Sequence, residues 1–485
     1  MFKTIHNIHF VGIGGSGMSG IAEVLLTLGY KVSGSDLKET PVTRRLQKLG
    51  ARIFIGHLAE NMAGAQVVVT STAVASQNPE VIAARAQGIP VIPRIEMLAE
   101  LARLKYTIAV AGTHGKTTTT SMVASVMQAG GLDPTVVVGG RLKHVDSGAM
   151  LGKGEFLVAE ADESDGSFLK LSPALAIITN IDNDHLDYYG TFERICDAFV
   201  EYAGRVPFYG CVIVCLDDPH IRAQLGRMTR RIVSYGIDSN ARCRAKNIHV
   251  DGGGTWFDVM WADKSLGTVR LRVPGRHNVL NALAAIAVGQ ELAIPFEKMV
   301  EGLGAFEGVG RRLELKGEKG GITVIDDYGH HPTEIRATLS ALRERYPNRR
   351  LVVLFQPHRY TRTQALWGDF ANCFRDADRV YVLDIYPAGE KPIEGVTSEL
   401  IVEEMRKTHP AATALGSPPD LDKLREELRS GDVVVTLGAG DVWKCGEQLL
   451  EMTPSPLVGE GRDGGAHTGT PHLNPPPQGG RMSQK

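Results

Sequence analysis

The sequence lacks the features that mark several large classes of protein. None of its apolar runs approaches the roughly 18 residues of a membrane-spanning helix, and its first residues lack a signal peptide's apolar segment. Its six cysteines form no C-x-x-C pair, which argues against a disulfide scaffold or a zinc cluster. The formal net charge is only -2, so there is no overall basic field to hold nucleic acid. These absences predict a cytoplasmic protein that binds neither nucleic acid nor membrane.

What is present is typical of a globular α/β protein. Hydrophobic residues make up 43% and charged residues 22% of 485 residues, a length that predicts about three domains. Short apolar runs alternate with helical patterns, which predicts stacked βα units with largely parallel sheets and flanking helices. Glycine is plentiful, at 55 residues, and several glycines directly follow predicted strands.

Three domains and a tail are predicted from the positions of these runs. Residues 1–105, 106–315 and 316–452 each begin near a strand, expected at 8–11, 106–110 and 322–325. The N-terminal and C-terminal domains are expected to be Rossmann-like, and the central one to resemble a P-loop domain. In residues 453–485, 13 of 33 residues are Pro or Gly and none is aromatic, which predicts a disordered tail.

A glycine-rich loop in the central domain predicts a nucleoside triphosphate site. It lies between the strand at 106–110 and a helix at 121–128, and it ends in a lysine and threonines. Backbone N–H groups of such a loop cradle phosphate, while the lysine reaches the terminal phosphates and a threonine hydroxyl meets Mg²⁺. A plain glycine-rich turn is the simpler alternative. The loop consists of Gly112, Thr113, His114, Gly115, Lys116, Thr117 and Thr118.

Polar residues that follow the next strands are candidates for the metal site. Residues 160–165 follow the strand at 156–158, and residues 179–185 follow the strand at 176–178. Mg²⁺ takes one or two carboxylates together with phosphate oxygens, and ligands of open parallel sheets bind at this edge. A solvated acidic turn is the alternative for the first segment, and His185 alone is more often structural than a ligand.

A second glycine-rich loop occupies residues 12–17, after the first strand. It has the form G-x-G-x-x-G, and Asp36 follows about 20 residues later, where it could hold a ribose hydroxyl. The alternatives are a nicotinamide-dependent dehydrogenase and a tight turn without a ligand. A dehydrogenase has no need of the second phosphate loop in the central domain.

Two further segments at strand ends lie in the C-terminal domain. Residues 326–332 hold two histidines before a proline, and residues 355–362 hold two arginines that could grip carboxylate or phosphate. A capped turn and a solvated basic surface remain equally open for these segments.

Taken in order, five blocks of sequence resemble the ATP-dependent Mur ligases of peptidoglycan synthesis, over residues 1 to about 450. The blocks are VGIGGSGMSGIAE, GTHGKTTTT, EADESD with TNIDNDHLD, GRHNVLNALAA, and DDYGHHPTE with FQPHRYTRT. The resemblance implies three domains that hold the UDP-sugar, ATP and the amino acid, the last acting as a lid. It implies Mg²⁺ and a reaction in which L-alanine joins the lactyl carboxylate of UDP-N-acetylmuramate through an acyl phosphate.

Three alternative functions remain open. They are a related ligase that reattaches recycled peptide, a nicotinamide-dependent oxidoreductase, and a nucleotide-sensing module. The oligomeric state is not predicted. Several relatives use a carbamylated lysine shortly after the metal-binding histidine, but this chain has no lysine between His185 and Arg205.

The resemblance also implies a role for each matching residue. The catalytic residues would be Lys116, His185, Asp327 and His330, and the metal ligands Thr117, Glu160 and His185. ATP would meet the residues of the central loop together with Asn180, His277, Asn278, Asn281 and Arg312. The UDP-sugar would meet Gly14, Gly15, Ser16, Gly17, Asp36, Ser71 and Thr72, and the acyl phosphate and amino acid would meet Arg359 and Arg362.

Overall fold

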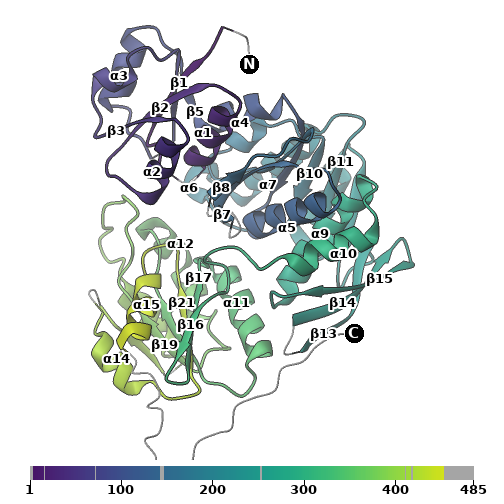
Figure 1. The fold of residues 1–485 in the computed structure, drawn as a ribbon. Coiled ribbons are helices and arrows are strands. Elements are labelled where there is room, and N and C mark those ends of the chain that lie inside the picture. Colours follow the sequence, from purple (N-terminus) through teal and green to yellow (C-terminus); the bar gives the residue numbers. More distant parts are fainter. Residues whose placement is uncertain are drawn as a thin grey trace, which may run out of the picture.

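Three α/β units, each built around its own sheet, make up the described part of the chain (Figure 1). The computed structural model describes residues 4–15, 17–71, 73–142, 147–251, 254–409, 411–416 and 419–452. Ser16, Thr72 and the predicted tail 453–485 lie outside the described residues. The predicted α/β class with largely parallel sheets is confirmed.

The N-terminal unit holds a wholly parallel sheet of order β3-β2-β1-β4-β5. The loop after β1 lies where the strand order reverses, which is the usual ligand position in such sheets. Its elements are β1 (Asn7–Val11), α1 (Met18–Thr27), β2 (Lys31–Asp36), α2 (Pro41–Lys48), β3 (Arg52–Ile55), η1 (Ala59–Met62), β4 (Val67–Thr70), α3 (Pro79–Ala86), β5 (Val91–Pro93) and α4 (Arg94–Ala102).

The central unit has a longer, mixed sheet of order β15-β14-β13-β12-β11-β10-β6-β9-β7-β8. The strands expected near 106, 156, 176 and 212 are all present, and they form its parallel middle. Its elements are β6 (Tyr106–Ala111), α5 (Lys116–Ala129), β7 (Thr135–Leu142), β8 (Ser147–Met150), β9 (Phe156–Glu160), η2 (Ser167–Lys170), β10 (Leu175–Ile178), α6 (Leu186–Tyr189), α7 (Phe192–Gly204), β11 (Cys211–Cys215), α8 (Pro219–Gln224), η3 (Leu225–Arg227), β12 (Ile232–Gly236), β13 (Cys243–Asp251), β14 (Gly254–Trp261), β15 (Lys264–Leu271), α9 (Arg276–Glu291) and α10 (Phe296–Ala305).

The C-terminal unit has the order β16-β17-β21-β18-β19-β20, with β16 antiparallel and the others parallel. Its elements are β16 (Glu314–Lys319), β17 (Ile322–Asp327), α11 (Pro332–Arg345), β18 (Leu351–Phe355), α12 (Tyr360–Ala371), β19 (Arg379–Val382), α13 (Ser398–Met405), β20 (Ala412–Ala414), α14 (Leu421–Glu427), β21 (Val433–Leu437) and α15 (Trp443–Met452).

The three units are not joined in the same way. Buried apolar side chains of the first two units form one continuous core that runs from Ile8 to Val309. Those of the third unit form two clusters of their own, which take alternate residues of its strands and so lie on opposite faces of its sheet. The third unit therefore has an independent core. Among the described residues, no helix is both long and apolar enough to cross a membrane.

Two glycines of α10 make a direct test of how this helix packs on α5. A Cβ at Gly302 would lie 2.5 Å from the carbonyl oxygen of Ser125 and 2.9 Å from the Cα of Val126, whereas at Gly304 the nearest atom is 3.9 Å away. We expect Gly302→Ala to lower the free energy of unfolding by about 1–3 kcal/mol, because helix backbones must separate.

Gly304→Ala is the matched control. It should leave stability unchanged or raise it by up to about 1 kcal/mol, because alanine loses less backbone entropy than glycine in a helix. Urea unfolding followed by tryptophan fluorescence measures both variants. Equal effects of the two substitutions would contradict close backbone packing at Gly302.

Candidate active site

The predicted phosphate loop joins the end of β6 to the start of α5, at the carboxyl edge of the central sheet. Gly112 and Gly115 both have positive φ angles, 128° and 83°. A Cβ at Gly112 would lie 2.1 Å from Thr179 Oγ1, and one at Gly115 would lie 2.9 Å from Asn281 Oδ1. Both positions thus require glycine for conformation and for space.

Lys116, the first residue of α5, is buried in a network of acceptors. Its Nζ donates to the carbonyl oxygens of Gly112 (2.6 Å) and Thr113 (3.1 Å), and to both carboxylate oxygens of Glu163 (2.9 Å each). Burial lowers the pKa of Lys116, but the carboxylates, Glu163 first, outweigh it and raise this pKa above its ordinary value. The lysine is therefore charged and already paired.

Glu160 and Thr117 form the centre of the predicted metal site. Burial raises the pKa of Glu160, and the Thr117 side chain hydrogen-bonds to it. Glu160 Oε1 is buried and has no hydrogen-bond partner. An unpartnered buried carboxylate oxygen beside a hydroxyl suits a hard divalent cation.

His185, the third predicted metal ligand, lies along the same wall. It has a φ of 58° at the start of α6. Its Nε2 is 3.9 Å from Glu163 Oε1 and 3.7 Å from Asp184 Oδ2. Thr117, Glu160 and His185 all line one cavity, so the three predicted metal ligands border the same space.

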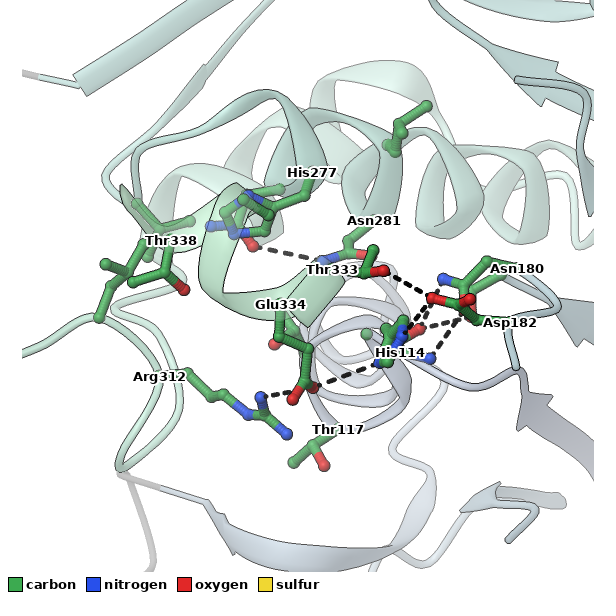
Figure 2. A pocket seen from close by; sticks show the side chains of 18 of the residues that line it. His114, Thr117, Asn180, Asp182, His277, Asn281, Arg312, Thr333, Glu334 and Thr338 are labelled. Carbon is green, nitrogen blue, oxygen red and sulfur yellow. Dashed lines mark hydrogen bonds and ion pairs between the residues drawn. The ribbon is translucent and has the colours of Figure 1, made fainter. Parts of the chain in front are cut away.

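A smaller cavity of about 360 Å³ lies beside the phosphate loop, between the central and C-terminal units. Its walls combine apolar side chains such as Val273 and Phe306 with polar ones (Figure 2). The predicted ATP residues that line it are His114, Gly115, Thr117, Thr118, Asn180, His277, Asn278, Asn281 and Arg312.

Hydrogen bonds fix the polar residues of this smaller cavity. Asn281 accepts from Thr119 Oγ1 (3.0 Å) and donates to Asn278 Oδ1 (3.3 Å), so the two asparagines are held as a pair. Burial, and then the charge of Arg312, lower the pKa of His277 to about 4, so this ring is neutral.

Asn180 lines the smaller cavity, and its amide also forms two hydrogen bonds with the backbone of the phosphate loop. Its Oδ1 accepts from the His114 backbone N–H (2.8 Å) and its Nδ2 donates to the His114 carbonyl (3.0 Å). Asn180 thus holds the backbone of the phosphate loop.

A larger cavity of about 1170 Å³ is lined by all three units. Lys116, Glu160 and His185 come from the central unit, and Gly14 and Gly17 from the loop after β1. The C-terminal unit contributes the predicted residues His330, Arg359 and Arg362. The structure therefore collects most of the predicted catalytic residues around one space.

Asp327 serves as a clamp for the turns around this space. Its Oδ2 accepts from the backbone N–H of Leu313 and its Oδ1 from that of Gly329, both at 2.8 Å. Burial raises the pKa of Asp327 to about 6. It holds the turn after Arg312 and the turn before His330 in place.

His330 is neutral and has a defined tautomer. Burial, followed by the charge of Arg362, lowers the pKa of His330 to about 3. Its Nδ1 lies 3.0 Å from the Tyr328 carbonyl oxygen, which only accepts, so Nδ1 carries the proton. Nε2 is left with a lone pair.

Some of the predicted UDP residues line the larger cavity, and Asp36 holds the loop that lines it. Asp36 Oδ2 accepts from the Gly14 N–H (2.8 Å), so this carboxylate braces the loop. Of the described lining residues of the larger cavity, none is Gly15, Asp36 or Ser71. Ser16 and Thr72 lie outside the described residues.

Several residues of the site were predicted only as part of a candidate segment, and Arg94 was not predicted at all. Glu163 pairs with Lys116, Arg94 lies 3.3 Å from Asp162, and Arg362 contacts both oxygens of Asp184 at 3.1 Å. Asp162, Glu163 and Asp184 lie inside the sequence blocks quoted above, so their position in those blocks could have identified them. Arg94 follows a strand end without any motif, and Glu334 lies one helical turn after His330.

Comparison with known proteins places this site in a family. Residues 7–106 match a family model described as Mur ligase family, catalytic domain; residues 110–289 match the Mur ligase middle domain. Residues 311–440 match the description Mur ligase, glutamate ligase domain.

Full-length relatives are also similar. The UDP-N-acetylmuramate–L-alanine ligase of Endomicrobium trichonymphae is 56% identical over 93% of this chain and all of its own length. That of Geobacter sulfurreducens is 57% identical over 93% of this chain and 98% of its own.

Two solved structures of ligases have a fold similar to that of this chain. The UDP-N-acetylmuramate–alanine ligase of Thermotoga maritima has a TM-score of 0.77 at 33% identity, covering 92% of this chain and 98% of that one. A murein peptide ligase of Psychrobacter arcticus has a TM-score of 0.68 at 26% identity, with the same coverage. The resemblance expected from the five sequence blocks is confirmed, and the chain belongs to the Mur ligase family.

Proposed function

We propose that the protein is an ATP-dependent ligase that joins L-alanine to the lactyl carboxylate of UDP-N-acetylmuramate in peptidoglycan precursor synthesis. The observation that carries this proposal is the larger cavity, because Gly14, Lys116 and Arg362 reach it from three separate units. Support comes from the relatives named as alanine ligases, at 56–57% identity over most of the chain. A dehydrogenase reaction would leave the central phosphate loop without a role.

In this proposal each of the three units binds one substrate. We assign the UDP-sugar to residues 1–105, ATP to 106–315, and the amino acid to the lid at 316–452. The reaction belongs in the cytoplasm, an assignment supported by six cysteines that are all free thiols.

ATP is assigned to the smaller cavity, with its phosphates on the loop that leads into the larger one. His114, Gly115 and Thr117 line both cavities, so the loop is the shared wall. The base would lie among Val273, Phe306 and their neighbours. The γ-phosphate would then point toward Lys116.

The first step forms an acyl phosphate. A lactyl oxygen attacks the γ-phosphorus, the bond to ADP breaks, and the phosphoryl group passes to the carboxylate. Lys116 neutralises charge between two anions that otherwise repel each other. A divalent cation held by Thr117, Glu160 and His185 would supply further positive charge at the phosphates.

The second step forms the amide. The L-alanine nitrogen attacks the carbonyl carbon of the acyl phosphate, inorganic phosphate leaves, and the nitrogen loses a proton. His330 Nε2, whose lone pair is free, can accept a hydrogen bond from this amine at the cavity wall. Arg359 or Arg362 would hold the amino-acid carboxylate.

Water must be kept from the acyl phosphate, which hydrolyses readily. The C-terminal unit closes one side of the larger cavity, and polar contacts tie it to the central unit. The independent core of this unit is consistent with its movement as a rigid lid.

Phosphate release tests the proposed reaction. With ATP, Mg²⁺ and UDP-N-acetylmuramate present, each amino acid or the recycled tripeptide is added in turn, and released phosphate is measured. We expect release to require both UDP-N-acetylmuramate and L-alanine. Release with tripeptide but not with alanine would favour the peptide-reattaching alternative, and ATP binding without product would favour a nucleotide sensor.

Lys116→Ala should abolish turnover. Loss of one charged donor to a developing anion costs about 10²–10³-fold in rate, so we expect phosphate release to fall at least this much. The same substitution leaves the buried carboxylate of Glu163 unpaired, which can destabilise the protein.

A double variant, Lys116→Met with Glu163→Gln, separates these two effects. It should restore the thermal stability lost in Lys116→Ala and still release no phosphate. Lys170→Ala, which removes an exposed lysine paired with Glu96, is the control with normal rate. Near-normal turnover by Lys116→Ala would show that the site is wrongly assigned.

Glu160→Gln should weaken divalent cation binding. Mn²⁺ titration followed by electron paramagnetic resonance, with an ATP analogue present, measures it without turnover. We expect affinity to fall by about tenfold or more, as is typical when a supporting group of a metal site is lost. Glu155→Gln, at the far end of the same strand, is the control, and equal affinity in both variants would exclude Glu160 as a ligand.

A further inference from the structure

The seam between the central and C-terminal units is centred on one residue of the phosphate loop. His114 Nε2 lies 3.0 Å from Asp182 Oδ2 in the central unit, and His114 Nδ1 lies 3.5 Å from Glu334 Oε1 at the start of α11 (Figure 2). The imidazole therefore stands between carboxylates that belong to two different units. Its side chain is 13% exposed.

We propose that His114 is a positioning residue that couples docking of the C-terminal unit to the conformation of the phosphate loop. The proposal rests on the ligase function proposed above, since the coupling matters for ATP and the acyl phosphate. It concerns the His114 side chain, whose two nitrogens are both directed at carboxylates. Phosphate binding by this loop instead depends on its backbone N–H groups.

The backbone of His114 is held by the central unit alone. Its N–H donates to Asn180 Oδ1 (2.8 Å), and its carbonyl accepts from Thr179 Oγ1 (2.6 Å) and Asn180 Nδ2 (3.0 Å). A change in the side chain consequently leaves these three bonds available. The side chain is the part of the loop that reaches across the seam.

Both carboxylates around His114 have further partners on the opposite side. Asp182 Oδ2 also accepts from Thr333 Oγ1 (2.7 Å), so the same oxygen joins the phosphate loop to the lid. Glu334 also pairs with Arg312 (3.2 Å) and accepts from the backbone N–H of His330 (3.0 Å). Movement of α11 thus changes the surroundings of the loop, of the smaller cavity and of His330 together.

The charges at the seam favour the docked arrangement. Burial alone lowers the pKa of His114, but hydrogen bonds from Asp182 and Glu334 outweigh burial and raise this pKa to about 9. The other charged or titratable groups at the seam include Arg312, the ion pair of Arg362 with Asp184, and His330 and His331, whose pKa values burial lowers. Near neutral pH a single imidazolium therefore bridges the two carboxylates.

Withdrawal of the lid removes Glu334 from His114 and Thr333 from Asp182 at once. The imidazolium is then left with one carboxylate and faces an open cavity. Docking of the lid and the placement of the His114 side chain are therefore coupled, and by linkage a ligand that favours this placement also favours docking.

Fluorescence energy transfer between the two units tests the coupling without turnover. The six native cysteines are buried, so dyes can be placed on exposed sites by Lys264→Cys and Asp422→Cys. Efficiency is recorded with saturating non-hydrolysable ATP analogue and UDP-N-acetylmuramate, for the unmutated pair and for His114→Asn, Glu334→Gln and their double variant.

We expect ligands to bring the unmutated units together. Each single variant should shift the docking equilibrium toward the open form by about tenfold, within the range of coupled neighbours. The double variant should be no more open than Glu334→Gln alone, because the contact of His114 with Glu334 is already lost in that variant. Glu334→Gln carries the test if His114→Asn fails to fold.

A pH titration gives a second readout. A group whose pKa is raised on docking contributes fully below its ordinary pKa, 6.5 for His114, and the contribution is lost as pH rises through about 9. The unmutated protein should open over that range, and His114→Asn should not show this transition. His409→Asn, whose imidazole hydrogen-bonds to the Ala377 carbonyl within the C-terminal unit, is the matched control.

The outcomes are separable from those of the proposed function. Full docking of both single variants, additive opening by the double variant, or no ligand-dependent change in the unmutated pair would each overturn the coupling. The ligase proposal is tested by phosphate release from the unmutated enzyme alone. Dye movement without phosphate release would therefore overturn the ligase function and not the docking contact.

Discussion

The buried ion pair between Lys116 and Glu163 sets the conditions for the rest of the site. An ammonium group and a carboxylate, 17% and 1% exposed, are stable here because each compensates the other and because two loop carbonyls accept from the lysine. The phosphate loop is therefore organised around its lysine before any phosphate arrives. The glycines of the loop, the first turn of α5 and the loop after β9 that carries Glu163 all have to meet at this point.

The contrast between apolar and polar contacts explains how the same chain can be both rigid and hinged. One continuous core joins the N-terminal and central units, which favours a fixed relation between the loop after β1 and the phosphate loop. The C-terminal unit instead meets the central unit through Thr333 with Asp182 and Arg362 with Asp184. Polar contacts of this kind can be exchanged for water, so undocking costs far less than opening an apolar core.

Sequence reasoning predicted what depends on local pattern and missed what depends on long-range placement. The βα alternation and the loop 112–118 were predictable, because strand, glycine, lysine and helix follow one another directly. The antiparallel strands β13–β15 were not predicted, although the alternation of polar and apolar side chains in residues 243–271 is a signal for half-buried strands that could have found them.

The roles of single side chains were harder still to predict. Asp36 and Asn180 stand where ligand contacts were expected, yet both brace backbone N–H groups of their loops. The contact between His114 and Glu334 joins residues 220 positions apart, and only the folded chain shows it.

The near-zero net charge has a structural counterpart, because three cations that lie at the larger cavity are already paired with acids. Lys116 contacts Glu163, Arg94 contacts Asp162, and Arg362 contacts Asp184. An anionic substrate that takes one of these cations must release a carboxylate into the same space. Each substrate thus adds its own charge and exposes another negative one, so local repulsion grows as the site fills. Glu160, with its unpartnered oxygen on this wall, is where a divalent cation would counter that growth. Binding of anionic substrates at these paired cations therefore depends on added positive charge, which a divalent cation beside Glu160 would supply.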